Sequence, residues 1–169
     1  MIRFILVVLI LFLYLILGIP VLLVEWVISR FHPHFRDISC LRMVQAAFKL
    51  ILFVTGANIQ YIGLEHIPKD QAVLYIVNHN SYFDILLTYS RCPGLTGYIA
   101  KAEMLKAPLL RDWMKRLYCL FLDRTDIRAG MQTILTGIAY IKQGISICIF
   151  PEGTRSKDGK MQPFREGSM

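Results

Sequence analysis

The sequence predicts an α/β fold with a largely parallel sheet flanked by helices, preceded by a membrane-anchoring helix and an amphipathic helix. Two patterns lead to this prediction. Between residues 72 and 150, short β-prone apolar runs alternate with stretches of helical periodicity, which is typical of parallel strands joined by crossover helices. Residues 4–24 instead form one apolar run without a charged side chain, longer than a core helix of a soluble domain requires.

The apolar run at residues 4–24 is predicted to cross a membrane. Its 21 positions are enough for a helix to span a hydrocarbon core of ~30 Å. The run also explains much of the chain's high mean hydropathy of +0.48. A cleaved signal peptide is the alternative, but the run is too long and no small-residue cleavage site follows it. We therefore expect residues 1–28 to be an uncleaved transmembrane anchor.

The positive charges beside this run predict its orientation. Only Arg3 precedes it, whereas Arg30, Arg36, Arg42 and Lys49 follow it. Because the cytoplasmic flanks of membrane helices carry an excess of Lys and Arg, the downstream part of the chain should lie on the cytoplasmic face.

Residues 29–56 are predicted to contain a polar joint and then an amphipathic helix over residues 38–55. Apolar side chains recur there at helical spacing, with Arg42 and Lys49 between them. We expect this helix to lie on the membrane surface or to re-enter the membrane. A second complete span is less favourable because Lys49 would lie near its centre.

The remaining residues, 57–169, are predicted to form the α/β domain. The expected strands cover residues 58–64, 72–77, 96–100, 119–122 and 145–150, and the expected helices cover residues 84–90, 108–118 and 127–142. Functional groups of such domains collect beyond the carboxyl ends of the strands. Four polar residues directly follow an expected strand: His79, Lys101, Arg124 and Glu152. This coincidence indicates a site at that edge of the sheet.

His79 and Asp84 are the candidate catalytic pair. A histidine can take up and return a proton near neutral pH. Asp84, five residues later, can accept a hydrogen bond from the other ring nitrogen and hold the tautomer. The alternative is a plain helix cap, in which Asn78, Asn80 or Ser81 satisfies the first amides of the next helix.

The segment that follows the last expected strand favours a phosphate group. Glu152, Gly153, Thr154 and Arg155 offer a flexible backbone, a hydroxyl and a guanidinium in a tight loop. Taken alone, Pro-Glu-Gly is also a common turn, so the loop by itself leaves the assignment open.

Charge and cysteine content narrow the possible partners. The net charge is +7, but no recognition helix or aromatic-basic interleaving supports a nucleic-acid partner. An anionic membrane surface and a phosphorylated substrate fit better. The four cysteines form no CxxC pair and share no metal-ligand spacing with the histidines, so we expect reduced thiols and no metal site.

Taken together, the motifs resemble the glycerolipid acyltransferase family, the PlsC-like 1-acyl-sn-glycerol-3-phosphate acyltransferases. The resemblance runs from about residue 58 to the end of the sequence. It rests on four ordered motifs: Asn78-His79 with Asp84, Lys101-Ala102-Glu103-Met104, Phe121-Leu122-Asp123-Arg124, and Phe150-Pro151-Glu152-Gly153-Thr154-Arg155. Met104 departs from the family's Leu, a change that conserves volume.

The resemblance implies acyl transfer from acyl-CoA or acyl-carrier protein to the 2-hydroxyl of lysophosphatidic acid. His79 would be the general base and Asp84 its orienting partner. The acceptor phosphate would be bound by residues of the other three motifs: Lys101, Arg124, Glu152, Gly153, Thr154 and Arg155. For Glu152 two roles are open, contact with the acceptor or ordering of the loop. No cofactor is implied beyond the acyl donor, and the location would be a bacterial inner membrane with the acyltransferase domain on the cytoplasmic face.

Several alternatives stay open at this point. The acceptor could be another lysophospholipid or glycerol 3-phosphate, and the chain could be a lipid-binding module without turnover. A covalent acyl-enzyme through Ser81 or a cysteine is a rival mechanism, although no Gly-x-Ser-x-Gly elbow surrounds Ser81.

The end of the sequence raises a further expectation. The strand at 145–150 is apolar on both faces, so it should lie inside the sheet, and no strand pattern follows it. Either earlier strands flank it on both sides, or the sequence is a fragment of a longer enzyme. We expect the fragment, because Phe164-Arg165-Glu166-Gly167 is similar to a family motif that leads into a further helix and strand.

Overall fold

The computed structural model describes residues 1–156 and 158–165, and among these four strands form one sheet. The strands are β1 (Leu74–Ile76), β2 (Thr96–Lys101), β3 (Leu120–Leu122) and β4 (Ser146–Ile149), in the order β1-β4-β2-β3. All three pairings are parallel. The predicted fold class, α/β with a parallel sheet, is therefore confirmed.

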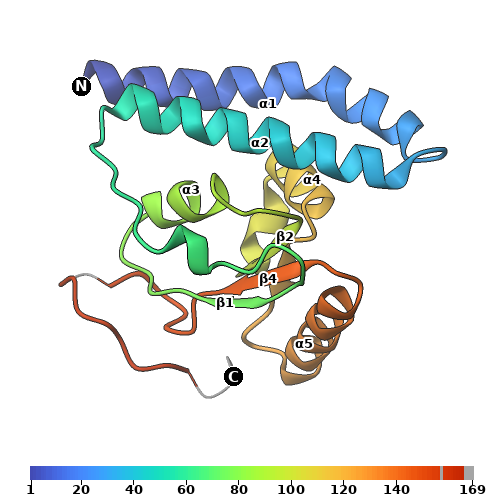
Figure 1. Cartoon of the computed structure of the whole chain (residues 1–169), viewed down its shortest axis with the longest axis vertical. Coiled ribbons are helices and arrows are strands. Elements are labelled where there is room, and N and C mark those ends of the chain that lie inside the picture. Colours follow the sequence, from blue (N-terminus) through green and yellow to red (C-terminus); the bar gives the residue numbers. More distant parts are fainter. Residues whose placement is uncertain (157, 166–169) are drawn as a thin grey trace.

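Helices cover both faces of this sheet (Figure 1). The long helices α1 (Ile2–Ile28) and α2 (Pro33–Thr55) lie side by side, and α3 (Phe83–Tyr89) and α4 (Pro108–Arg116) separate them from the sheet. The fifth helix, α5 (Ile127–Lys142), packs on the opposite face against β3 and β4. Two short 3₁₀ helices, η1 (Leu64–His66) and η2 (Ala102–Lys106), complete the described elements.

One predicted strand is wrong. Residues 58–64 pair with no strand of the sheet; they run without regular structure into η1, which Gly63 precedes with a φ of +79°. The alternation of apolar side chains is real but has another cause. Ile59, Tyr61 and Leu64 line a cavity beside β1, so they are partly buried without backbone pairing.

The position of β4 removes one reason for expecting a further strand after residue 150. β4 pairs with β1 on one side and with β2 on the other, so two earlier strands flank it. Its apolar character on both faces needs no later strand. Of the motif at residues 164–167, Glu166 and Gly167 lie outside the described residues.

The two faces of β4 belong to two different packing layers. Cys148 points into the cluster between the sheet and the helices α2, α3 and α4, together with Tyr89, Tyr98 and Trp113. Ile147 points to the other face, where Gly137 lets α5 approach the sheet closely. Both side chains are at most 2% exposed, which explains why the strand lacks an amphipathic pattern.

Helices α1 and α2 are fastened to the domain by contacts through α4 and the turn after it. An ideal Cβ on Gly18 of α1 would lie 2.9 Å from Trp113 Nε1, and Arg116 donates a hydrogen bond to the carbonyl of Leu22 at 3.3 Å. Tyr118 donates its hydroxyl proton to the buried carboxylate of Asp37 in α2 at 2.5 Å. The helix pair is thus part of the folded domain.

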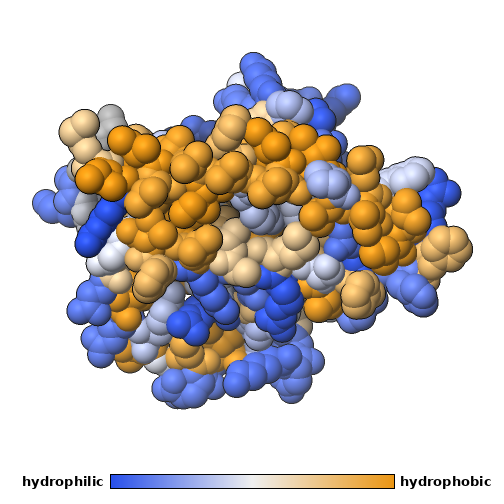
Figure 2. Space-filling view, turned by 90° about the horizontal axis from the view of Figure 1, so that it is seen from above, coloured by the Kyte–Doolittle hydropathy of each residue, from blue (hydrophilic) through white to orange (hydrophobic). Residues whose placement is uncertain are grey.

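Both helices are long and apolar enough to cross a membrane. α2 begins at Pro33, five residues before the predicted start, so the joint between the helices is only residues 29–32. One side of α2 is buried under α1 and against the domain, whereas α1 exposes large apolar side chains along its whole length. Figure 2 shows the resulting apolar surface over the two helices.

Gly97 gives a test of the sheet packing. A Cβ at this position of β2 would lie 2.1 Å from the carbonyl oxygen of Tyr118, a residue held at a φ of +59°. Because backbone would have to move, we expect Gly97→Ala to lower the free energy of unfolding by at least ~2 kcal/mol. Gly94→Ala is the control, since its Cβ would meet nothing within 4 Å. Equal thermal midpoints for the two variants in detergent would contradict this account.

Candidate active site

The four predicted site segments meet at one edge of the sheet. Because β1 to β4 are all parallel, their carboxyl ends point the same way. His79 follows β1, Lys101 ends β2, Arg124 follows β3 and Glu152 follows β4. The placement expected from the sequence is therefore correct for all four.

His79 is held in one orientation from two sides. Its Nδ1 lies 2.9 Å from Asp84 Oδ2, and its ring stacks on Phe150 with centroids 4.2 Å apart. The same oxygen of Asp84 accepts the backbone N–H groups of Asn80 at 2.7 Å and Ser81 at 2.8 Å. With Nδ1–H donated to the carboxylate, Nε2 carries the lone pair.

This geometry unites the two interpretations that the sequence left open. The hydroxyl oxygen of Ser81, one of the residues considered for a cap, accepts the N–H of Phe83, the first residue of α3, at 3.1 Å, and Asp84 in the first turn accepts the N–H groups of Asn80 and Ser81 before the helix. The same carboxylate also binds the ring of His79. The side chains of His79 and Asp84 are 17% and 18% exposed, so the pair is reachable from solvent yet mostly shielded.

Glu152 has a structural position that the sequence did not reveal. The residue is 1% exposed. Its Oε1 accepts the backbone N–H of His79 at 2.8 Å, and its Oε2 accepts the backbone N–H of Gln162 at 2.8 Å. The carboxylate therefore joins the segments after β1 and β4 to the segment around Gln162.

The other predicted phosphate residues separate into two groups. An ideal Cβ on Gly153 would lie 3.4 Å from Arg124 Nη2, so Arg124 and the glycine loop are together. Arg155 instead lies over the ring of Tyr82, with its guanidinium carbon 3.6 Å from the centroid. Thr154 and Lys101 are exposed at the same edge.

The loop that carries Arg124 is shaped by its neighbour Asp123. Oδ1 of Asp123 accepts both the N–H of Thr125 at 2.8 Å and its hydroxyl at 2.7 Å. These hydrogen bonds hold the pKa of the Asp123 carboxyl below its ordinary value. The carboxylate therefore stays ionised and keeps the turn in place.

An apolar cavity of about 290 Å³ lies beside the pair, between α3 and the segment before β1. It is lined by residues from five parts of the chain, among them Ile59, Leu64, Ile67, Tyr75, Val77, Leu87, Tyr98 and Cys148. Val77 is two residues before His79, and Tyr98 adjoins Phe150, on which the His79 ring stacks. The lining is mostly apolar, as a site for a hydrocarbon chain would be, and neither His79 nor Asp84 is part of it.

The site also contains residues to which sequence reasoning assigned no role. Tyr82 lies under the Arg155 guanidinium and Gln162 donates its N–H to Glu152, and neither carries a chemical signal in the local pattern. Phe150 is part of a motif given above, but its stacking on the His79 ring was not expected. No group of three or more His, Cys, Asp and Glu residues in the described ranges is placed to hold a metal ion.

Comparison with known proteins defines the class. The sequence model of the family described as Acyltransferase matches residues 58–169. The crystal structure of the 1-acyl-sn-glycerophosphate acyltransferase PlsC from Thermotoga maritima superposes with a TM-score of 0.80 at 27% identity, covering 96% of this chain and 64% of that one.

Curated relatives agree with this match. The 1-acyl-sn-glycerol-3-phosphate acyltransferase of Borreliella burgdorferi is 32% identical over 130 residues, 75% of this chain and 51% of the relative. The alpha form from Homo sapiens is 31% identical over 137 residues, 79% of this chain and 47% of the relative. The chain thus spans about half the length of these relatives. It belongs to the acyltransferase family, and the relatives named here are 1-acyl-sn-glycerol-3-phosphate acyltransferases, PlsC among them.

Glu152 gives a test of the site's construction. Glu152→Gln places an amide NH₂ against one of two backbone donors, and a buried donor left unsatisfied costs ~1–3 kcal/mol. We expect a lower thermal midpoint and faster hydrogen exchange at the amides of His79 and Gln162. Thr154→Ala, in the same loop but exposed, should change neither. Unaltered exchange at both amides in Glu152→Gln would refute the role given to this carboxylate.

Proposed function

We propose that this chain transfers a fatty acyl group from acyl-CoA or acyl-carrier protein to the 2-hydroxyl of lysophosphatidic acid, giving phosphatidic acid for phospholipid biosynthesis. The observation that carries the proposal is the 2.9 Å contact between His79 Nδ1 and Asp84 Oδ2 at the carboxyl edge of the sheet. The names of the relatives, 1-acyl-sn-glycerol-3-phosphate acyltransferase, support the choice of acceptor.

The reaction follows from the orientation of the imidazole. Nε2 of His79 removes the proton of the acceptor hydroxyl as the oxygen attacks the thioester carbonyl. The tetrahedral intermediate then collapses, the C–S bond breaks, and the leaving thiolate takes the proton from the imidazolium. Asp84 holds the tautomer and stabilises the imidazolium, and general-base help of this kind contributes ~10²–10⁴-fold.

Direct transfer fits better than a covalent acyl-enzyme. The hydroxyl oxygen of Ser81 accepts the N–H of Phe83 at 3.1 Å, so it caps α3. Burial raises the pKa of Cys148 to about 12 and that of Cys119 to about 11. Both cysteines therefore remain thiols at neutral pH and are poor nucleophiles.

The acyl chain and the acceptor phosphate would occupy different parts of the site. The cavity beside Val77 is apolar and would receive a fatty acyl chain. Cationic and loop residues surround the sheet edge and would receive the phosphate of the acceptor: Lys101, Arg124, Gly153, Thr154 and Arg155. Glu152 would act on the phosphate indirectly, by fixing the loop.

The direct test is release of free CoA from acyl-CoA with lysophosphatidic acid, other lysophospholipids and glycerol 3-phosphate as acceptors. Release with lysophosphatidic acid above the others supports the proposal. If CoA is released only with another acceptor, that compound and not lysophosphatidic acid is the acceptor. If neither acyl-CoA nor acyl-carrier protein supports release with any acceptor, a lipid-binding module is favoured.

His79→Ala should lower turnover by at least ~10²-fold, because no other group would take the hydroxyl proton. Asp84→Asn should lower it as well, since the preferred tautomer is lost. His66→Ala is the matched control, because His66 lies in η1 with a side chain that is 83% exposed. Turnover of His79→Ala near that of the unmodified chain would exclude the general-base role. Acyl transfer should be measured on protein that retains its thermal midpoint.

We also infer that the α1–α2 pair attaches the enzyme to the cytoplasmic face of a bacterial inner membrane. Apolar side chains of α1 such as Phe4, Phe12 and Leu17 are 59–73% exposed. Arg3, at the start of α1, donates a hydrogen bond to the carbonyl of Thr55 at the end of α2, at 3.1 Å. Because the contacts of α1 run along its length, we favour insertion of the pair into one leaflet over a complete span by α1.

Thiol labelling distinguishes these two arrangements. With an impermeant reagent outside intact cells, Ile2→Cys should stay unlabelled and should react after detergent is added. Arg30→Cys, just after α1, should stay unlabelled until detergent is added, whether or not α1 spans the membrane, so it serves as the control. The unmodified chain gives the background labelling of the native cysteines. Labelling of Ile2→Cys from outside would show that α1 spans the membrane.

A further inference from the structure

Arg155 lies over the ring of Tyr82, and the distance between them fixes its orientation. The guanidinium carbon is 3.6 Å from the ring centroid. Conjugated C–N bonds are ~1.3 Å long, so a guanidinium that stood edge-on would place a nitrogen ~2.3 Å from the centroid, well inside the contact distance of ~3.5 Å. The guanidinium of Arg155 must therefore lie flat on the ring.

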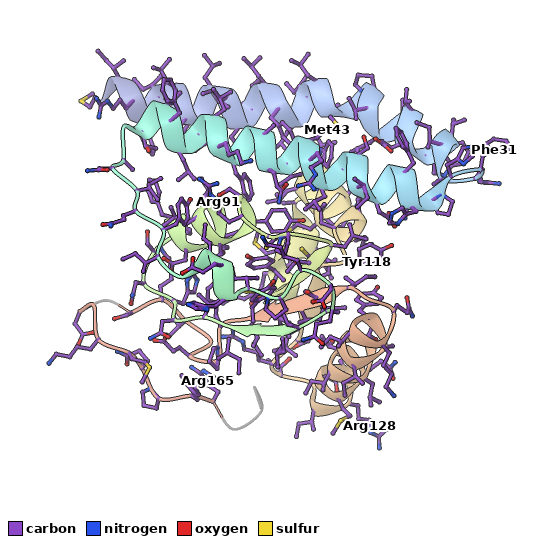
Figure 3. All side chains as sticks on the ribbon, viewed as in Figure 1. Phe31, Met43, Arg91, Tyr118, Arg128 and Arg165 are labelled. Atoms are coloured by element: carbon purple, nitrogen blue, oxygen red, sulfur yellow. The ribbon has the colours of Figure 1, made fainter. Side chains whose placement is uncertain are left out.

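The other two cation–π contacts among the described residues are longer. Arg91 lies over Tyr61 at 4.4 Å, and Arg30 lies over Trp26 at 5.0 Å. Figure 3 shows Arg91 beside α3, and because Arg91 precedes β2 it lies toward the amino ends of the strands. Arg30 follows α1. The shortest of the three contacts is thus the one at the carboxyl edge of the sheet.

A flat stack restrains a guanidinium without occupying its hydrogen-bond donors. The N–H groups point outward in the plane of the guanidinium, whereas the ring covers one of its faces. Within the described residues, the side chain of Arg155 forms no ion pair. A salt bridge would also orient the group, but it would take the fork that an anion needs. Arg155 is therefore oriented and still open to an anionic ligand.

Backbone contacts relate this stack to the candidate base. Ser156, the residue after the arginine, donates its N–H to the carbonyl of His79 at 2.7 Å. Ser81, the residue before Tyr82, donates its N–H to Asp84, which holds the His79 ring. Both members of the stack thus adjoin a residue that is hydrogen-bonded to the His79–Asp84 pair, so the guanidinium has a set position relative to the imidazole.

We propose that Tyr82 is a positioning residue for the acceptor phosphate: its ring holds the guanidinium of Arg155 flat, with the donors free for the phosphate, at a fixed distance from His79. This inference rests on the proposed function, because it takes the acceptor phosphate to bind Arg155. In lysophosphatidic acid, neighbouring carbon atoms carry the reacting hydroxyl and the phosphate. A phosphate held at a fixed distance from Nε2 therefore also places the hydroxyl.

The test is a double-mutant cycle on binding, which does not depend on turnover. The full chain in detergent micelles is titrated with lysophosphatidic acid and with the 1-acylglycerol of the same chain, which lacks the phosphate. We expect Arg155→Ala to weaken binding of lysophosphatidic acid by about 10- to 100-fold, the range for a hydrogen bond to a charged group. Tyr82→Leu should weaken it by about 2- to 5-fold, the range for an exposed cation–π contact. Binding of the 1-acylglycerol should change in neither variant.

The cycle separates positioning from a general effect of the substitution. In the Arg155→Ala background, Tyr82→Leu should cause no further loss, because the ring then has no guanidinium to hold. Tyr82→Phe keeps the aromatic face and should bind lysophosphatidic acid as the unmodified chain does. Trp26→Leu is the control, because it removes an exposed cation–π contact near the end of α1 and should leave binding unchanged.

Several results would overturn the positioning role: no loss in Tyr82→Leu, additive losses in the double variant, an equal loss in Tyr82→Phe and Tyr82→Leu, or equal losses for both lipids. No loss in Arg155→Ala would place the phosphate elsewhere and overturn the role as well. The side chain of Tyr82 is 69% exposed, so its variants should fold, and Tyr82→Gln replaces Tyr82→Leu in the cycle if the latter lowers the thermal midpoint.

The proposed function fails separately. Absence of acyl transfer with the expected cycle refutes the reaction and leaves the positioning role in place. Transfer to lysophosphatidic acid, with binding that depends on Arg155 but not on Tyr82, refutes only the positioning role.

Discussion

The candidate site depends on one buried carboxylate. Glu152 is 1% exposed, and its two oxygens accept the backbone N–H groups of His79 and Gln162. A buried carboxylate is tolerated only when its oxygens are hydrogen-bonded, so these two contacts determine where the adjoining segments lie. One contact sets the start of the loop that carries the candidate base, and the other sets the tail that carries Arg165. A single side chain thereby connects the candidate base, which follows β1, to the segments that follow β4.

A second carboxylate refines this arrangement. Oδ2 of Asp84 accepts two backbone amides as well as the ring of His79. The amides fix the carboxylate, and the fixed carboxylate selects one imidazole tautomer. Phe150 limits rotation of the ring from the other side. Glu152 therefore positions the backbone of His79, whereas Asp84 and Phe150 position its side chain.

The sequence predicted those features that are encoded locally. The predicted bounds of α5 match the structure, and those of the strands β2, β3 and β4 differ from it by at most one residue at each end. These boundaries were predictable because glycines, prolines and changes of periodicity mark them. The strand at residues 58–64 was wrong because alternation reports burial, and here a cavity rather than a sheet causes the burial. The place of β4 between β1 and β2 was left open because strand order depends on crossovers that no local pattern records. For the same reason the sequence left the role of Glu152 open between contact with the acceptor and ordering of the loop, because its hydrogen-bond partners lie 73 and 10 positions away along the chain.

The contacts of α4 relate the site to the membrane. Trp113 contacts α1 at Gly18, and Arg116 binds the carbonyl of Leu22, so the apolar surface of α1 has a fixed direction relative to the sheet. Residues before β1 and residues of α3 line the apolar cavity, and α2 packs on α3. The cavity therefore lies in the part of the domain that faces the helix pair, whereas the guanidinium groups lie at the carboxyl edge of the sheet. A lysolipid has the same division between an apolar chain and a charged headgroup. In the proposed reaction, an acceptor would therefore bind with its tail toward the bilayer and its phosphate toward Gly153, and its hydroxyl would lie between them, beside His79.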